Sequence, residues 1–234
     1  METHVRIIDN KLVYRSAEET LVIEPWGRDG LRVRVTPLPE IINRPWALTE
    51  HVDTQAHIEI SDTAATIRNG KISARICDIY TQKGHLEFFK WADKTPIPIL
   101  REYDYCVHAH NPGTRRFKSA GDGLFECELH FEAQDGERMY GMGENATGRL
   151  NLKGCVIDLY QRHVKAVVPF VVSSQGYGFL WNNPSLGRAE FGNNMTRWIS
   201  YGSKQIDYYI TAGDSYANLM ENYTDVTGHA PEFP

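Results

Sequence analysis

The sequence contains no apolar run long enough to cross a membrane and no cluster of basic residues. Its longest apolar stretch, 166–172, is interrupted by Pro169 and falls far short of the roughly 18 residues that a membrane-spanning helix needs. With 25 Lys and Arg against 30 Asp and Glu, the formal net charge is −5, which offers no surface for phosphates. We therefore expect no membrane span and no nucleic-acid partner.

Cysteine is also scarce, and its spacing excludes two common uses of this residue. Neighbouring cysteines lie 21 to 29 residues apart, unlike the close ligand pairs of zinc sites or the dense disulfides of a small secreted protein. We expect reduced, buried thiols at Cys77, Cys106, Cys127 and Cys155. No metal and no other cofactor is expected. The N-terminus lacks the apolar core of a secretory signal, so the predicted location is cytoplasmic.

The usual motifs of three catalytic classes are missing. No Gly-x-Ser-x-Gly elbow, no Walker lysine motif and no Cys-x-x-Cys pair occurs, which argues against serine, nucleotide and thiol redox chemistry. The segment 141–145, Gly-Met-Gly-Glu-Asn, has two of the glycines of a phosphate-binding loop. No helical pattern follows it to direct N–H groups at an anion. We predict a tight backbone turn there.

Alternation of apolar and polar residues, closed by turn residues, is present along most of the chain. Over 31–36, leucine and valine alternate with Arg32 and Arg34, which predicts one half-buried strand. The dipeptide Asn-Gly at 69–70 predicts a hairpin whose two-residue loop has positive φ at both positions. Further strands are expected over 125–132, 166–173, 178–181, 188–191, 196–201 and 205–211.

Only the C-terminal segment has the periodicity of a helix. Asp214 or Ser215 can cap its N-terminus, and Gly228 followed by Pro231 marks its end. Apolar residues recur at helical spacing at Tyr216, Leu219, Met220, Tyr223 and Val226. Short strands with turn signals about every ten residues, and no βαβ alternation, predict an all-β fold. We expect a large antiparallel two-sheet β-sandwich with a single C-terminal α-helix.

Two groups of ionisable residues are candidates for chemistry. One strand face has the residue types of general acid–base catalysis or of a cation site, at Glu126, Glu128, His130 and Glu132. An antiparallel strand with one solvated face has this pattern by default, and we favour that explanation. His108 and His110 share another strand face, but no third metal ligand stands at a matching distance in the sequence.

Ordered motifs cover roughly the last hundred residues. They are Y-G-M-G-E at 140–144, P-F-V-V-S-S-Q-G-Y-G at 169–178, F-L-W-N-N-P at 179–184, I-D-Y-Y-I at 206–210 and Y-T-D-V-T-G-H-A-P at 223–231. In this order they resemble the N-terminal β-sandwich of glycoside hydrolase family 31, a family of retaining α-glucosidases and α-xylosidases. A weaker resemblance extends over 21–26 and 29–35.

The resemblance implies a galactose mutarotase-like supersandwich over residues 1–213 and, over 214–234, a helix and linker that lead toward a (β/α)₈ catalytic barrel. Family members carry both catalytic aspartates on that barrel, a module of typically about 250 residues. Because the chain ends at Pro234, we expect a non-catalytic fragment of an α-xylosidase or α-glucosidase, inactive alone and without a catalytic residue. Its expected partners are the barrel and, through the parent enzyme, the carbohydrate substrate.

The resemblance also assigns substrate-binding residues. The segment Tyr160-Gln161-Arg162-His163 corresponds to a family loop, N-R-D, that reaches over the barrel mouth and contacts the sugar next to the scissile bond. Gln161 and His163 replace the Asn and Asp of that motif, so Arg162 is the closest match. Its planar set of donors suits vicinal hydroxyls or a barrel carboxylate.

Two other functions are compatible with the sequence. Its 5 Trp, 12 Tyr and 9 Phe allow a free-standing carbohydrate-binding module, although a sandwich core explains most of these rings. An aldose epimerase-like enzyme needs a His and a Glu at the sugar ring, for which His108, His110 and Glu128 are candidates.

The C-terminal helix also predicts a surface property. If a barrel normally covers it, the sandwich alone does not cover all of Tyr216, Leu219, Met220 and Tyr223. Exposed apolar surface of this kind is commonly buried by two-fold pairing, so a homo-oligomer is expected.

Overall fold

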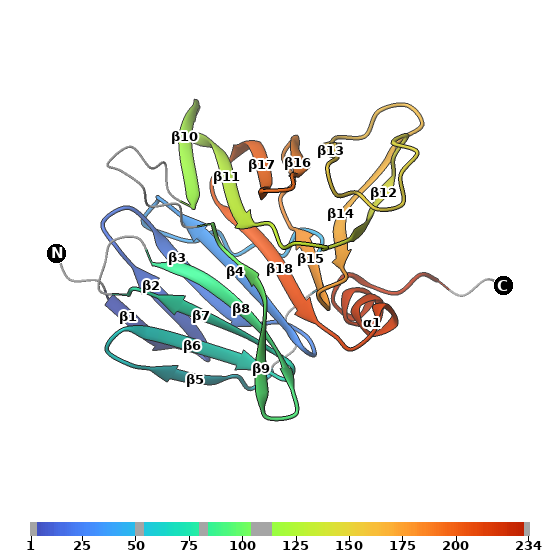
Figure 1. Ribbon diagram of the computed structural model, residues 1–234. Coiled ribbons are helices and arrows are strands. Elements are labelled where there is room, and N and C mark those ends of the chain that lie inside the picture. Colours follow the sequence, from blue (N-terminus) through green and yellow to red (C-terminus); the bar gives the residue numbers. More distant parts are fainter. Residues whose placement is uncertain (1–3, 50–53, 80–83, 104–113, 232–234) are drawn as a thin grey trace.

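The computed structural model of the protein describes residues 4–49, 54–79, 84–103 and 114–231. Over these residues the chain forms eighteen strands and one helix, α1 (Tyr216–Thr227), which lies at the C-terminal end (Figure 1). No helix in this part of the chain is long and apolar enough to span a membrane. The predicted all-β fold with a single C-terminal helix is confirmed.

The strands in the described ranges form three antiparallel sheets (Figure 1). Sheet A contains, in spatial order, β1 (His4–Ile8), β2 (Lys11–Arg15), β3 (Thr20–Pro25), β4 (Gly30–Thr36), β18 (Ile206–Ala212), β15 (Tyr177–Trp181), β14 (Ala166–Ser173) and β12 (Met139–Glu144). Sheet B contains β5 (His57–Ile60), β6 (Ala64–Asn69), β7 (Ile72–Cys77), β8 (His85–Ala92) and β9 (Thr95–Arg101). Sheet C contains β10 (Arg115–Gly121), β11 (Leu124–Glu132), β17 (Met195–Ser203), β16 (Gly187–Phe191) and β13 (Val156–Leu159).

Sheet A forms one layer of the sandwich, and sheets B and C together form the other. β6 packs on β2 and β3, β7 packs on β4, and β11 packs on β18. β9 also contacts β11, so the two smaller sheets adjoin, and one apolar core runs between the layers. The sandwich is confirmed, but it has three sheets where two were predicted. Twist accumulates from strand to strand, and two smaller sheets follow a twisted eight-stranded sheet more closely than one large sheet would.

Aromatic rings fill a large part of this core. The Phe179 ring stacks on those of Trp198 and Tyr208, each with ring centroids 4.9 Å apart, and meets Phe131 edge-on at 5.5 Å. All four side chains are buried. Such ring pairs contribute about 0.5–1.5 kcal/mol each beyond the burial of their area. Core packing therefore explains much of the aromatic content, as the sequence suggested.

The hairpin predicted at 69–70 exists, but its loop is shifted by one residue. Asn69 pairs with Ile72 as the last rung of the β6–β7 ladder, so the loop is Gly70–Lys71, and only Gly70 has a positive φ, of 56°. The Asn69 amide instead donates to the carbonyl oxygens of Gly27 and Gly30, at 2.8 and 2.7 Å. A tertiary contact with the β3–β4 turn thus outweighs the local preference of Asn for the loop position.

The helix α1 begins and ends where the sequence predicts. Ser215 is the N-cap, and its Oγ accepts a hydrogen bond from the backbone N–H of Asn218 at 3.2 Å. Gly228 follows the last turn with φ of 101°, a conformation that side-chain-bearing residues rarely adopt.

The strand predicted over 31–36 is confirmed as β4, but the predicted half-burial is wrong, because β4 is buried on both faces. Its inner side chains face the core, and Arg32 and Arg34 on the other face are covered as well, with 0% and 3% exposure. The segment 37–49 covers them, since the carbonyl oxygens of Arg44 and Ile42 accept hydrogen bonds from Arg32 and Arg34. This segment was not predicted to lie over a sheet. Period-two alternation reports which side chains face the core and does not show what covers the other face.

The outer face of β11 is less solvated than predicted. His130 is 5% exposed, and its Nε2 lies 2.9 Å from a Glu128 carboxylate oxygen. Arg116 and Arg197 approach the same oxygen at 3.5 and 3.9 Å. The pKa of His130 is lowered, because the effect of burial outweighs the opposite effect of the neighbouring Glu128 carboxylate. A cross-strand ionic cluster occupies the middle of this face.

The cysteines differ in burial. Cys127 is buried, whereas Cys77 and Cys155 are half-buried, and all three are free thiols. The prediction of buried thiols is therefore wrong for Cys77 and Cys155. Cys106, like His108 and His110, lies outside the described residues.

Candidate functional site

The predicted substrate-binding residues lie in a loop that joins two sheets. Residues 160–165 connect β13 of sheet C to β14 of sheet A, at the end of the domain where β12, β13 and β14 gather (Figure 1). Tyr160 is half-buried, while Gln161, Arg162 and His163 are exposed. The structure therefore brings all four residues together at one edge of the sandwich.

Hydrogen bonds within the loop give it a defined shape. The Gln161 side chain accepts from the backbone N–H of Val167 at 3.2 Å and donates to the carbonyl oxygen of the same residue at 3.4 Å. The backbone N–H of Lys165 donates to the carbonyl oxygen of Arg162 at 3.1 Å, and His163 has a left-handed φ of 56°. Gln161 thus ties the loop to β14, and the loop displays Arg162 and His163 to solvent.

The Y-G-M-G-E segment braces this loop from the neighbouring strand. β12 pairs with β14, and the register shifts between Gly141 and Gly143, which marks a β-bulge. Both glycines have positive φ, of 116° and 73°, and a Cβ on Gly143 would collide with the carbonyl oxygen of Ala166. Met142 between them is buried. The predicted tight turn is wrong, because these glycines bend a strand so that its backbone can approach the start of β14.

Exposed apolar side chains surround this end of the domain. Val164 at the loop tip is 73% exposed, and Leu150 in the preceding connection is 83% exposed. On α1, Tyr216 and Met220 are also exposed, and the Tyr216 ring meets that of Tyr140 on β12 at 5.7 Å. The same end therefore combines an ordered polar loop with apolar side chains suited to a partner.

The sequence predicts that the sandwich alone does not cover all of four α1 side chains, which are Tyr216, Leu219, Met220 and Tyr223. The sandwich covers two of them. Leu219 is buried, and the Tyr223 ring stacks on Phe170 with centroids 4.0 Å apart. Tyr216 and Met220 are left at 48% and 45% exposure. The incomplete covering of this helix is thus observed, although it is limited to two residues.

A second candidate surface is a hollow of about 320 Å³ beside the segment 37–49. Trp46 lies at this hollow with 43% of its surface exposed and with φ of 55°, a strained conformation for an aromatic residue. The Arg44 guanidinium lies 5.7 Å from the centre of the indole ring. The exposed Lys204 lies in the same lining. An exposed ring beside polar donors is an arrangement that binds sugars by stacking and hydrogen bonding.

Buried polar side chains hold the backbone on both sides of Trp46. The Asn182 amide donates to the carbonyl oxygen of Pro45 at 3.0 Å and accepts from the N–H of Ala47 at 3.1 Å. Gln205 makes the same pair of bonds to the backbone of Ile42, at 2.8 and 3.1 Å. The conformation of Trp46 is therefore fixed by its surroundings.

Next to these hydrogen bonds lies a buried ion pair between β4 and β18. Arg32 donates from Nε and Nη2 to the two carboxylate oxygens of Asp207, at 3.0 and 2.6 Å, and also to the carbonyl oxygen of Arg44. Both charged side chains are 1% exposed. Sequence reasoning missed this pair. The available signal was an arginine on the non-core face of one strand together with an aspartate in the I-D-Y-Y-I motif of another.

Of the residues named for an epimerase, the described part of the chain contains Glu128 alone. Glu128 is engaged by the ionic cluster on the outer face of sheet C. His108 and His110 lie outside the described residues. No observation favours that alternative.

Comparison with known protein families identifies the family of this chain. Residues 20–188 match the profile of the glycosyl hydrolase 31 N-terminal galactose mutarotase-like domain. The chain belongs to this family. The resemblance noted in the sequence motifs is thereby confirmed, as is the galactose mutarotase-like sandwich.

The family 31 domain has relatives in bacteria and fungi. It is 38% identical to the uncharacterized family 31 glucosidase ORF2 of Pseudescherichia vulneris, over 96% of this chain and 44% of that protein. It is 32% identical to alpha-xylosidase A of Aspergillus niger, over 92% of this chain and 31% of that protein. A solved GH31 alpha-xylosidase from a soil metagenome, complexed with xylose, superimposes with a TM-score of 0.90 at 36% identity, covering 99% of this chain and 35% of that one. The chain thus spans less than half the length of these relatives.

Proposed function

We propose that this family 31 domain is the non-catalytic N-terminal part of a retaining α-glycosidase of the α-xylosidase or α-glucosidase type, with a role in carbohydrate metabolism. In this proposal residues 1–213 are the sandwich, and residues 214–234 are a helix and linker leading to a (β/α)₈ barrel. The observation that carries the proposal is the loop 160–165, an ordered and exposed loop on a domain that is 36% identical to part of an α-xylosidase.

The loop has the chemistry for a sugar at the rim of a barrel. The planar guanidinium of Arg162 suits vicinal hydroxyls, and its exposure leaves it available to a substrate or a barrel carboxylate. Because the two Gln161 hydrogen bonds to Val167 already order the loop, less conformational entropy is lost when it binds. Tyr160 and His163 flank this group. We assign no catalytic residue to the domain and expect it to be inactive alone.

Replacing Arg162 with Ala in the full-length enzyme is expected to raise KM about 10- to 100-fold, because hydrogen bonds to a charged group are worth about 1.5–3 kcal/mol. Steady-state kinetics on an α-xyloside and an α-glucoside measure the effect. The matched control is Arg75→Ala, an exposed arginine of sheet B, which should leave KM unchanged. A normal KM with a lowered melting temperature for Arg162→Ala would show instead that this residue braces the barrel.

The barrel is also the proposed cover for the exposed side chains of α1. Without the barrel, we expect two copies of the chain to pair through the exposed side chains of Tyr216 and Met220. The cytoplasmic location stays a prediction.

Carbohydrate binding by the domain itself is a second candidate, and the exposed Trp46 at its hollow favours it. In calorimetric titrations of the 234-residue chain with xylose, maltose and xyloglucan fragments, we expect saturable binding to at least one of these ligands. Trp46→Ala should weaken that binding at least about tenfold, roughly 1.4 kcal/mol. The exposed aromatic Tyr216, replaced by Ala, is the control. Equal losses in both variants, or no saturable binding, would exclude this site.

A further inference from the structure

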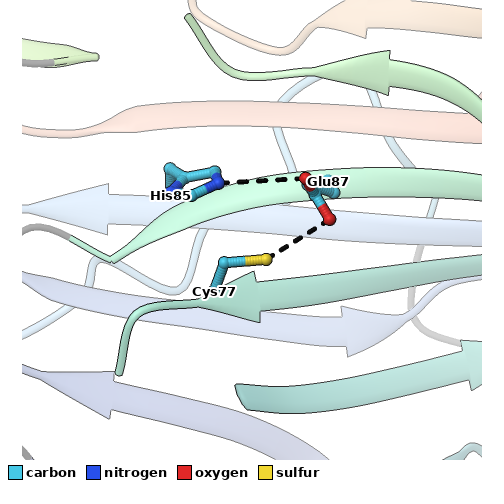
Figure 2. A group of neighbouring side chains, drawn as sticks. All are labelled: Cys77, His85 and Glu87. Atoms are coloured by element: carbon cyan, nitrogen blue, oxygen red, sulfur yellow. Dashed lines mark hydrogen bonds and ion pairs between the residues drawn. The ribbon is translucent and has the colours of Figure 1, made fainter. Parts of the chain in front are cut away.

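Three metal-ligating side chains meet at one end of the β7–β8 hairpin (Figure 2). Cys77 is the last residue of β7 and is directly paired with His85, the first residue of β8. Glu87 follows two residues later on the same face of β8, so it lies diagonally across from Cys77. Because the side chains of β7 and β8 that point the other way fill the core, this group lies on the outer face of sheet B.

The three ligand atoms are close enough to share one ion. The Cys77 Sγ lies 3.3 Å from the Oε2 of Glu87, and the Nε2 of His85 lies 3.9 Å from its Oε1. All three ligand atoms lie within 4.8 Å of one another. A tetrahedral zinc site with bonds of about 2.0–2.3 Å places its ligand atoms roughly 3.3–3.8 Å apart, so small side-chain rotations complete the geometry.

Two charged side chains, Asp78 and Arg101, lie beside the group. Asp78 places its Oδ2 3.6 Å from the Nδ1 of His85, the ring nitrogen that does not face Glu87. A carboxylate at the second nitrogen is the usual partner of a zinc-binding histidine, since it favours the tautomer in which Nε2 carries no proton. The Nε of Arg101 lies 3.3 Å from the Oε1 of Glu87 and helps to orient this carboxylate.

We propose that Cys77, His85 and Glu87 form a zinc site that links β7 to β8. The residues match the ligand types of Zn²⁺, namely one thiolate, one imidazole and one carboxylate, and the fourth position is left to water. The zinc ion displaces the thiol proton of Cys77, which leaves as H⁺ while the Zn–S bond forms. The free thiol is protonated near neutral pH, because burial, followed by the Glu87 charge, raises its pKa to about 12.

The test uses the metal-depleted 234-residue chain, titrated first with Co²⁺ and then with Zn²⁺. We expect one Co²⁺ per chain, with the visible bands of a tetrahedral site and a thiolate charge-transfer band, and full displacement by one equivalent of Zn²⁺. Zn²⁺ should also raise the melting temperature. Cys77→Ser should abolish the charge-transfer band, and Cys155→Ser, which removes another half-buried thiol, should leave it unchanged.

Two further variants keep the test decisive if Cys77→Ser folds poorly by circular dichroism. Glu87→Gln preserves the shape of the side chain and should also remove stoichiometric binding. Asp78→Asn should weaken Zn²⁺ affinity about 10- to 100-fold without changing the cobalt spectrum. Absence of the charge-transfer band in the wild-type chain, or its persistence in Cys77→Ser, would overturn the proposal.

Discussion

Replacing Arg32 with Met is expected to lower the free energy of unfolding by about 3–5 kcal/mol, because it leaves the buried Asp207 carboxylate without its guanidinium partner. The same change removes the donor to the Arg44 carbonyl oxygen, so the segment around Trp46 should loosen. Urea denaturation followed by circular dichroism measures the stability. Trp46 exposure can be followed by the quenching of tryptophan fluorescence.

The matched control is Arg28→Met. Arg28 is 63% exposed and faces Glu221 and Asp225 at 3.7 Å, and a pair of this kind contributes about 0–1 kcal/mol. Adding Asp207→Asn to Arg32→Met removes the uncompensated charge and should recover part of the lost stability. If Arg32→Met costs no more than Arg28→Met, the buried pair does not hold the two strands together.

Gly143→Ala is expected to be the most damaging single-methyl substitution in the Y-G-M-G-E segment. The left-handed φ of 73° alone costs about 1–2 kcal/mol for a residue with a Cβ. The added Cβ also collides with the backbone of Ala166, which cannot move without opening the β12–β14 pair. We expect a total loss of about 3 kcal/mol or more, measured by chemical denaturation.

Gly148→Ala separates these two causes. Gly148 has a similar φ of 65°, but no atom lies within 4 Å of the position that a Cβ would take. This variant should lose only about 1–2 kcal/mol. Equal losses at both positions would show that backbone conformation, and not the close approach of β12 to β14, is what requires glycine in the motif.

The sequence by itself determined the elements with strong local signals. The helix cap at Ser215 and its end at Gly228 follow from hydrogen bonding and backbone conformation within a few residues. Period-two alternation identified strands such as β11, because core-facing side chains must alternate wherever the sheet lies. The ordered motifs after residue 139 identified the family.

Only the tertiary structure decided which polar side chains are buried and what they hold. Arg32 and Asp207 are 175 residues apart in sequence, and strand pairing between β4 and β18 is what brings them together. Asn69 lies in the β6–β7 ladder and not in the loop, because its side chain donates hydrogen bonds to the carbonyl oxygens of Gly27 and Gly30 in another hairpin. Cys77, His85 and Glu87 became neighbours through the register of β7 on β8, whereas the wide spacing of the cysteines had predicted no metal. Local sequence specifies backbone preference, but the partner of a charged or polar side chain depends on elements that are distant in the chain.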